Sequence, residues 1–122
     1  MLIKKFRPSP PLGEYVRSFG IVQFLFPANI KIPIKPFSPR PENSLCFIPK
    51  DPEYIAYPGN DTKIKRPPIT VYGQHTLLNS RNPGQDFLAF VVDFQPGVLY
   101  RLTGVPLHEL TNTYVEAEYI IS

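Results

Sequence analysis

The chain has one cysteine, two histidines and no tryptophan, and none of its apolar runs approaches the length of a membrane span. A single cysteine, Cys46, allows no intrachain disulfide, and this favours a reducing compartment such as a bacterial cytoplasm. Because apolar residues flank Cys46, we expect a small buried side chain rather than a reactive thiol. The N-terminus lacks the continuous apolar segment of a signal peptide. We therefore expect a cytoplasmic protein without a membrane segment.

The shortage of histidine argues against metal chemistry. A metal-binding cupin needs a cluster of His and Glu ligands, whereas His75 and His108 belong to no His-x-His unit. A lone strand histidine such as His75 can line a binding site, but it is more commonly a hydrogen-bonded structural residue. We therefore expect neither a metal nor another cofactor.

Patterns of covalent catalysis are also missing. No serine lies in a nucleophile elbow, and no glycine-rich loop could hold a phosphate. Asp93 and Glu109 would form a carboxylate pair if the fold brought them together. The simpler interpretation is that Asp93 accepts backbone hydrogen bonds at a strand end while Glu109 solvates a helix. We assign no catalytic residue and expect no enzyme.

The charge balance is mildly basic. Thirteen Lys and Arg against ten Asp and Glu give a net charge of +3. The basic groups at 4–7 and 63–66 could contact phosphate, but both are interpreted as solvated strand edges. No two adjacent amphipathic helices joined by a short turn, as needed to read a major groove, can be found. The chain itself is not expected to bind specific DNA.

Proline and short apolar runs are abundant. Sixteen prolines and seven glycines, 23 of 122 residues, punctuate short β-type segments, and the length suits one domain. About eight strands are expected: 19–26, 30–34, 45–48, 54–57, 62–65, 69–72, 75–78 and 87–94, after an extended segment at 2–6. Asn79–Gln85 is expected to be a turn, and Pro58–Asp61 a hairpin turn. The pattern predicts a mainly β fold, a cupin-like jelly-roll barrel over about 1–95.

A helical segment is expected after the last strand. Phe87–Phe94 is apolar at nearly every position, so both of its faces should be covered. Pro96-Gly97 then starts a helix in which Val98, Leu99 and Leu102 face the sheet, and Gly104 ends it. Short helices are therefore expected over 96–122, within a single domain at 1–122.

Three stretches carry a resemblance to a known family. They are Pro11-Leu12-x-x-Tyr15-Val16-Arg17-Ser18-Phe19, then Gly73-Gln74-His75, and last Val92-Asp93-Phe94-Gln95-Pro96-Gly97 with Leu102-x-Gly104-x-Pro106-x-x-Glu109-Leu110-Thr111-Asn112. Together they resemble the N-terminal sensor domain of AraC-type bacterial transcriptional regulators. The resemblance implies sensing of a small-molecule effector, whose identity it does not give, and pairing of two chains. It also implies DNA contact through a C-terminal domain with two helix-turn-helix units, which this chain lacks.

Three functions therefore compete. The leading one is the ligand-sensing and dimerisation domain of an AraC-like regulator. The second is a free-standing jelly-roll module that binds a small molecule or a protein, and the third is a small cupin-type enzyme, disfavoured by the missing ligand cluster.

Candidate ligand-binding residues follow from a barrel interior that holds one ligand. They are the strand residues Phe24, Phe47, Tyr72, His75 and Phe90, together with Arg40 in a proline-rich loop, which could clamp an acidic ligand. For each aromatic residue the competing interpretation is ordinary core, and for Arg40 it is a solvated loop side chain.

Candidate self-association residues lie near the C-terminus. Leu107, Leu110 and Tyr119 follow the first helix, and Val115, Tyr119 and Ile120 could share a helical face. This is more apolar surface than one small barrel needs to cover, and such surface usually marks an interface. The alternative is that the tail folds back onto its own sheet and the domain is monomeric.

Overall fold

The computed structural model describes residues 2–32, 35–37, 41–59 and 62–120. Within them the fold is mainly β, as predicted. The strands are β1 (Leu2–Phe6), β2 (Val16–Leu25), β3 (Lys35–Phe37), β4 (Ser44–Phe47), β5 (Tyr54–Ala56), β6 (Ile64–Lys65), β7 (Ile69–Tyr72), β8 (Asn79–Asn82), β9 (Asp86–Phe94) and β10 (Tyr114–Glu116). The helical elements are α1 (Val98–Thr103) and the 3-10 turns η1 (Pro10–Leu12), η2 (Leu107–Leu110) and η3 (Ala117–Tyr119). No described helix is long and apolar enough to cross a membrane.

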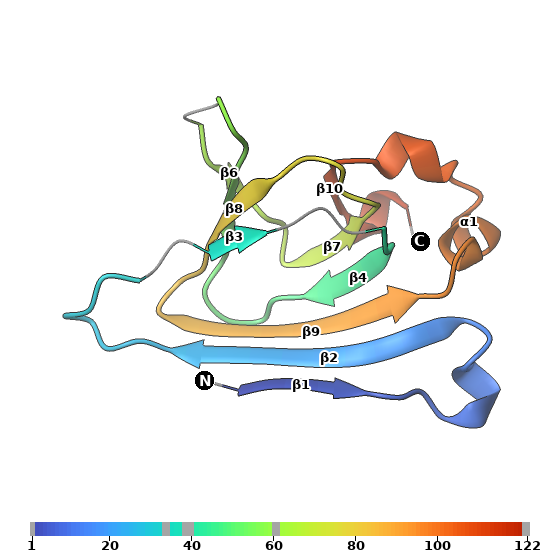
Figure 1. Cartoon of the computed structure of the whole chain (residues 1–122), viewed down its shortest axis with the longest axis horizontal. Helices are drawn as coiled ribbons and strands as arrows, with labels where there is room; N and C mark the ends of the chain where they lie inside the picture. Colours follow the sequence, from blue (N-terminus) through green and yellow to red (C-terminus); the bar gives the residue numbers. More distant parts are fainter. Residues whose placement is uncertain (1, 33–34, 38–40, 60–61, 121–122) are drawn as a thin grey trace.

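The strands form two antiparallel sheets (Figure 1). The large sheet has the order β1-β2-β9-β4-β7-β10, and the small sheet has the order β3-β8-β5-β6. The sheets keep separate strand orders and do not close into a barrel, so a closed barrel was the wrong expectation. The large sheet has two faces: an inner face toward the small sheet and an outer face away from it.

The longest strand pair of the large sheet is β2–β9. Phe24 lies opposite Phe87 and Val22 opposite Ala89, and the register shifts between Val16 and Ser18. Because successive side chains of a strand alternate between faces, these residues lie on the inner face, where Phe87 and Ala89 are buried. The inner face thus carries one hydrophobic core: Cys46, Ile48, Tyr72, Phe87 and Ala89, with Val22, Phe24, Val91 and Tyr114 against them.

A second core lies on the outer face. It contains Val71, Leu99, Leu110 and Ala117, with Leu45, Phe94, Val105, Leu107, Val115 and Ile120 packed around them. The helical elements that follow β9 therefore cover one end of this face only. Phe90, in the middle of β9, stays 41% exposed, so the expectation that both faces of this strand are covered is wrong at that position. The reason is that α1 begins only at Val98, beyond the end of the strand.

Turn and stop signals were read correctly from the sequence. β5 and β6 form the expected hairpin, with Gly59 at a positive φ of 76° in its turn. Gly104 ends α1 in the left-handed region, with φ 75°, and its backbone N–H bonds to the carbonyl of Tyr100. Pro96 was expected at the first helical position, but helix α1 begins two residues later, at Val98, and Gly97 is its N-cap. Leu102 is 63% exposed and does not face the sheet.

Three other local predictions were wrong. Asn79–Asn82 is not a turn but strand β8, which pairs with both β3 and β5, so pairing overrides weak β-propensity. Only an isolated bridge occurs within 75–78, and 30–32 is not a strand. Val115 lies in β10 opposite Val71 rather than on a helix, because this pairing places its side chain in the second core.

Candidate functional site

Charged and aromatic side chains from both sheets meet on the inner face. We call this group the polar cluster: Glu53, Arg66, Tyr72, Arg81 and Tyr114. Glu53 and Arg66 flank the β5–β6 hairpin, Arg81 lies on β8, and Tyr72 and Tyr114 face each other across β7 and β10. Residues far apart in the sequence thus build one site between the sheets.

A buried ion pair is the centre of the polar cluster. Arg66 Nη1 donates to Glu53 Oε1 over 2.7 Å, and the Arg66 backbone N–H donates to the Glu53 carbonyl over 2.9 Å. The side chains are only 2% and 4% exposed. Both bonds follow from the hairpin register, in which Tyr54 lies opposite Lys65, so that the residues just outside them also meet. The hairpin therefore fixes backbone and side chain of Arg66 together.

Two tyrosine rings hold the Arg66 guanidinium on the large sheet. Arg66 Cζ lies 4.9 Å from the ring centroid of Tyr72 and 4.9 Å from that of Tyr114. The two rings are 5.4 Å apart, because their residues are register partners. Cation–π contacts of this kind strengthen when they are desolvated. Burial alone would lower the pKa of Arg66, but Cys46, Tyr72 and Glu53 more than offset it and raise the pKa above its ordinary value. The guanidinium is charged.

Arg81 joins the small sheet to the same groups. Its Nε lies 3.9 Å from Glu53 Oε1, and its Nη2 donates to the Tyr114 hydroxyl over 3.5 Å. Burial raises the pKa of Tyr114, so this hydroxyl stays protonated at neutral pH. The polar cluster therefore contains two cations and one carboxylate.

Several buried polar atoms of the site have no hydrogen-bond partner among the described residues. They are Nε and Nη2 of Arg66 and both amide atoms of Asn79, which is 1% exposed. Asn79 precedes Arg81 by two residues on β8, so their side chains share a face of the small sheet. Each unsatisfied buried group costs about 1–3 kcal/mol, and native proteins keep few of them.

His75 extends the site beyond the polar cluster. Its ring lies 4.8 Å from that of Tyr114 and 6.2 Å from that of Tyr72, and its Nε2 is 3.4 Å from the Tyr57 hydroxyl. Its Nδ1 is 3.2 Å from the carbonyl oxygen of Gly73. Burial lowers the pKa of His75, so the imidazole is neutral at pH 7. Burial also raises the pKa of Tyr57 to about 12.

The predicted ligand-binding residues separate into two groups. Tyr72 lies beside Arg66, and His75 lies beside Tyr72. Phe24 packs against the inner core, and its ring stacks on that of Phe87 with the centroids 5.9 Å apart. Phe47 and Phe90 are cross-strand partners and directly follow Cys46 and Ala89, which lie in the inner core. Because successive side chains of a strand alternate between faces, Phe47 and Phe90 lie on the outer face, away from the polar cluster. Arg40 lies outside the described residues.

The sequence reading missed Glu53, Arg66, Asn79 and Arg81. Arg66 was grouped with Lys63 and Lys65 as a solvated edge, and only those two lysines are exposed. A usable signal existed, since Glu53 and Arg66 lie equally far before and after the expected Pro58–Asp61 turn and would meet in a hairpin closed there.

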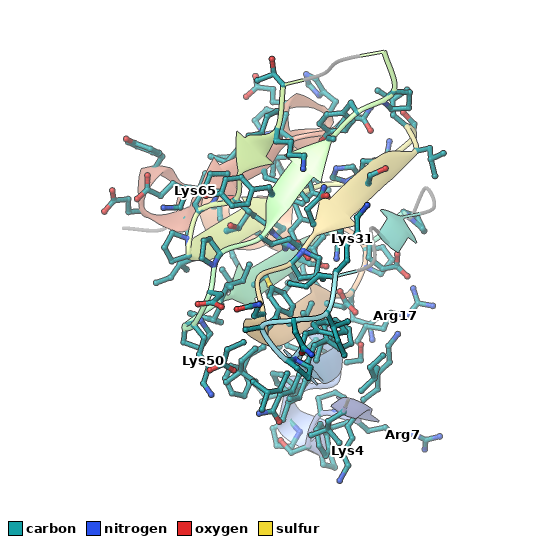
Figure 2. The ribbon with its side chains drawn as sticks, turned by 90° about the vertical axis from the view of Figure 1, so that its left-hand side faces the viewer. Lys4, Arg7, Arg17, Lys31, Lys50 and Lys65 are labelled. Atoms are coloured by element: carbon teal, nitrogen blue, oxygen red, sulfur yellow. The ribbon has the colours of Figure 1, made fainter. Side chains whose placement is uncertain are left out.

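Other cations lie apart from the polar cluster. Lys4, Arg7, Arg17, Lys31, Lys50 and Lys65 are spread over the length of the molecule (Figure 2). Among the described residues, no group of three or more His, Cys, Asp or Glu is placed to hold a metal. Asp93 accepts hydrogen bonds from the hydroxyls of Ser18, over 3.2 Å, and of Ser44. Burial raises the pKa of the Cys46 thiol, which is 1% exposed.

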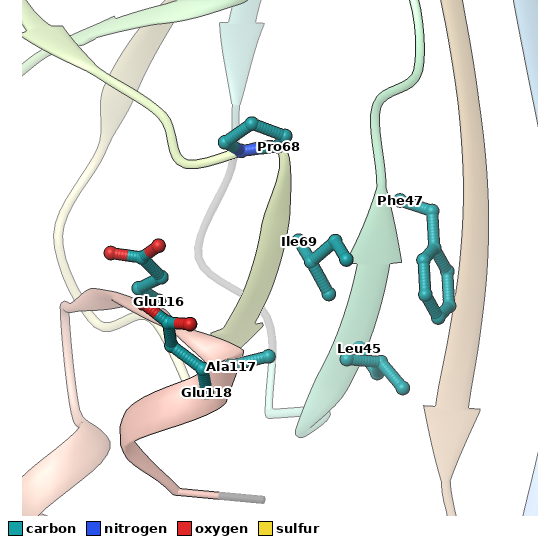
Figure 3. A pocket seen from close by; sticks show the side chains of 7 residues that line it. All are labelled: Leu45, Phe47, Pro68, Ile69, Glu116, Ala117 and Glu118. Carbon is teal, nitrogen blue, oxygen red and sulfur yellow. The ribbon is translucent and has the colours of Figure 1, made fainter.

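A separate apolar hollow of about 400 Å³ opens on the outer face (Figure 3). Its lining residues are Leu45, Phe47, Pro68, Ile69, Glu116, Ala117 and Glu118. Glu116 and Glu118 place two carboxyl groups at one side of this apolar surface. Repulsion from Glu118 raises the pKa of Glu116.

The predicted self-association residues differ in exposure. Leu110 is buried and Leu107 packs against the second core, so these two act within the domain. Tyr119 is 77% exposed. Tyr100 and Leu102 on α1 are exposed as well.

The structure thus defines a mainly β domain with a buried cluster of polar and aromatic side chains between its two sheets. The chain belongs to the family described as a domain of unknown function, DUF6597, whose model matches residues 4–116. A search of the curated proteins found no significant match, and a search of the solved structures found none.

Proposed function

We propose that this domain binds a small molecule between its two sheets and acts as the sensor of an AraC-like transcriptional regulator in the cytoplasm. The arrangement of its strands is a jelly-roll of the cupin type, opened along one side. The domain carries no catalytic centre, and it reaches DNA only through a helix-turn-helix domain joined to it. The resemblance of 11–19, 73–75 and 92–112 to such sensors supports this assignment.

One observation carries the proposal: within the described part of the chain, four buried polar atoms of Arg66 and Asn79 have no hydrogen-bond partner. A residue kept only for stability would not leave both amide atoms of Asn79 unsatisfied, because an apolar side chain of similar size would cost less. A ligand that supplies the missing partners gives these atoms a purpose. The aromatic groups of Tyr72, His75 and Tyr114 supply contact area beside them.

An Asn79→Leu variant tests this role. Purified domain is equilibrated with the small molecules of a bacterial extract, separated from unbound compounds by gel filtration, and its retained compounds are identified by mass spectrometry. The wild type should retain a compound that Asn79→Leu loses, while the variant unfolds at the same or a higher temperature because it buries no unsatisfied amide. Asn82→Leu, on the same strand, is the control, since Asn82 Nδ2 has a partner in the Tyr54 carbonyl. It should retain the compound.

Two results contradict the proposal. One is that the wild type retains nothing that the Asn79→Leu variant lacks. The other is that Asn79→Leu is destabilised by more than about 1 kcal/mol, which would show that the amide stabilises the fold.

Self-association is the second part of the proposed function. On the outer face, Phe90 lies beside Phe47, which lies beside Ile69, and all three side chains are exposed. This row continues into the apolar hollow at Phe47 and Ile69. Contiguous exposed apolar surface marks an interface, and a second copy of the chain would place two DNA-binding domains on adjacent half-sites.

Sedimentation of three variants separates the candidate surfaces. Phe90→Asp changes the outer face, Tyr119→Asp changes the exposed tail, and Leu25→Asp, 75% exposed at the end of β2, is the control. We expect a wild-type dimer that Phe90→Asp alone converts to monomer. A wild type that remains monomeric at high micromolar concentration refutes self-association.

A further inference from the structure

One row of side chains crosses the outer face of the large sheet. Its members are register partners on five successive strands: Lys4 on β1, Ile21 on β2, Phe90 on β9, Phe47 on β4 and Ile69 on β7. The row ends at the apolar hollow, where Glu116 and Glu118 stand on the side of Ile69 opposite to Phe47 (Figure 3). It thus runs from a cation, through four apolar side chains, to two carboxylates.

The other charged strand residues near this row already have partners or lie on the inner face. Asp86, at the start of β9, has its carboxylate 3.4 Å from Lys50 Nζ. Arg17 lies at the register shift of β2, with its Nη1 3.8 Å from Glu42 Oε1. Asp93 is buried on the inner side, because strand residues alternate and Val92 points outward.

Lys4 and the two carboxylates remain as opposite charges at opposite ends of one face. Among the described residues, none of these three groups takes part in an ion pair. The pKa of Glu116 is raised, chiefly because Glu118 repels its charged form. A cation brought to these carboxylates would relieve that repulsion.

The two ends of the face also differ in height. In the row next to the first, Phe6 on β1 is 46% exposed, whereas Val71 on β7 is fully buried. The reason is that Leu99 and Ala117, from the helical elements after β9, pack over Val71. The end of the face at β7 and β10 is therefore raised, and the end at β1 and β2 is bare.

A face of this kind is complementary to itself in one orientation. A two-fold axis parallel to the strands reverses the strand order of a second copy, so that β1 of one copy lies opposite β10 of the other (Figure 1). An axis across the strands would place β1 against β1, like charge against like charge, and raised end against raised end. Packed sheets keep their strands aligned in either case, so charge and height decide between the two.

We infer that two copies of the domain pack outer face to outer face about a two-fold axis parallel to the strands of the large sheet, with Lys4 of each copy against Glu116 and Glu118 of the other. In this arrangement Phe90 lies opposite Phe47 of the second copy. The inference rests on the proposed self-association, to which it adds the orientation of the two copies and the charges that select it.

Charge reversal on separate chains tests the orientation. Lys4→Glu in one variant, and Glu116→Lys with Glu118→Lys in another, each bring like charges together at both ends of the dimer. Each variant should self-associate about tenfold more weakly than the wild type in sedimentation at low salt, since two exposed charge contacts change from attraction to repulsion. An equimolar mixture of the two variants restores opposite charges at both ends, and should associate as tightly as the wild type.

Lys5→Glu is the matched control, because it makes the same change of charge one residue along β1. Lys5 is the register partner of Gly20, and both lie on the inner face. This variant should self-associate like the wild type. Thermal unfolding of every variant confirms that the fold is kept.

Carbodiimide cross-linking examines the contact in the unchanged protein. The reagent joins a lysine amine to a carboxylate that touches it, and Lys4 and Glu116 lie on opposite edge strands of the same chain. Isotope-labelled and unlabelled chains are mixed, so that mass spectrometry distinguishes links between copies from links within one. A link from Lys4 to Glu116 or Glu118 between two copies is the expected product.

The outcomes separate orientation from association. If the mixed variants associate no more tightly than each variant alone, or if links join the two copies only through other residues, the orientation is wrong while self-association stands. If Lys5→Glu weakens association as much as Lys4→Glu, net charge rather than this contact is responsible, and the inference also fails. A wild type that is monomeric at high micromolar concentration refutes the self-association itself, and the orientation with it.

Discussion

Replacing Glu53 by Gln should destabilise the domain strongly, because it removes the charge but keeps the shape of the side chain. Glu53 and Arg66 are buried to 4% and 2% exposure, and their atoms are 2.7 Å apart. Removing one partner of such a pair costs about 3–5 kcal/mol, since the remaining charge is left uncompensated. The Gln oxygen can still accept one bond from Arg66, so we expect a loss near the lower end, about 3 kcal/mol. For a domain of this size that is a large part of its total stability.

Urea unfolding followed by tyrosine fluorescence measures this loss, since the chain has seven tyrosines and no tryptophan. The matched control is Asp86→Asn, the same chemical change in an exposed pair, whose partner Lys50 Nζ lies 3.4 Å away with both side chains more than 40% exposed. The control should lose at most about 1 kcal/mol. A double variant, Glu53→Met with Arg66→Met, should recover most of the stability because it removes both charges. If Glu53→Gln costs no more than Asp86→Asn, the buried Glu53–Arg66 pair does not stabilise the fold.

Three further predictions concern other parts of the molecule. Gly73→Ala should destabilise the domain by about 1–3 kcal/mol, because its new Cβ would lie 2.6 Å from the Leu110 carbonyl oxygen, whereas Gly20→Ala meets nothing closer than 3.8 Å and should be nearly neutral in thermal unfolding. Cys46 should react with iodoacetamide at pH 8 at least about tenfold more slowly in the folded than in the urea-unfolded chain, since the raised pKa and burial both suppress its thiolate; equal rates would contradict this. The lowered pKa of His75 means that the unfolded chain binds more protons, so stability should fall as the pH falls through about 6.5, and a His75→Gln variant should show a shallower loss in urea titrations at pH 7.5 and 5.5.

Local signals in the sequence predicted the parts of the fold that depend on neighbouring residues. The hairpin at Gly59, the stop at Gly104 and the strand at Phe87–Phe94 each follow from side-chain pattern or backbone preference within a few positions. Elements decided by distant partners were read wrongly. β8 has the composition of a turn and is a strand because β3 and β5 flank it, and Val115 joins a sheet through β7.

The candidate site was half predictable for the same reason. Tyr72 and His75 stand out as aromatic residues on expected strands; Tyr72 lies beside Arg66, and His75 lies beside Tyr72. Arg66 and Glu53 follow charged or proline-rich sequence that is typical of solvated loops. Their burial depends on the large sheet, whose Tyr72 and Tyr114 cover Arg66. Phe47 and Phe90 were assigned to the wrong face because an apolar strand without alternation does not reveal its inward side.

The pairing of β2 with β9 has a consequence for synthesis of the chain. Residues 26–85 separate the two strands, so at ordinary translation speed β9 emerges about 3–12 s after β2. During that delay β2 has β1 on one side and an open, largely apolar edge on the other. A nascent chain in this state is prone to aggregate, and a truncated product that ends before Asp86 would keep that edge permanently. Ribosome-bound chains should therefore resist protease only once Phe94 has left the exit tunnel.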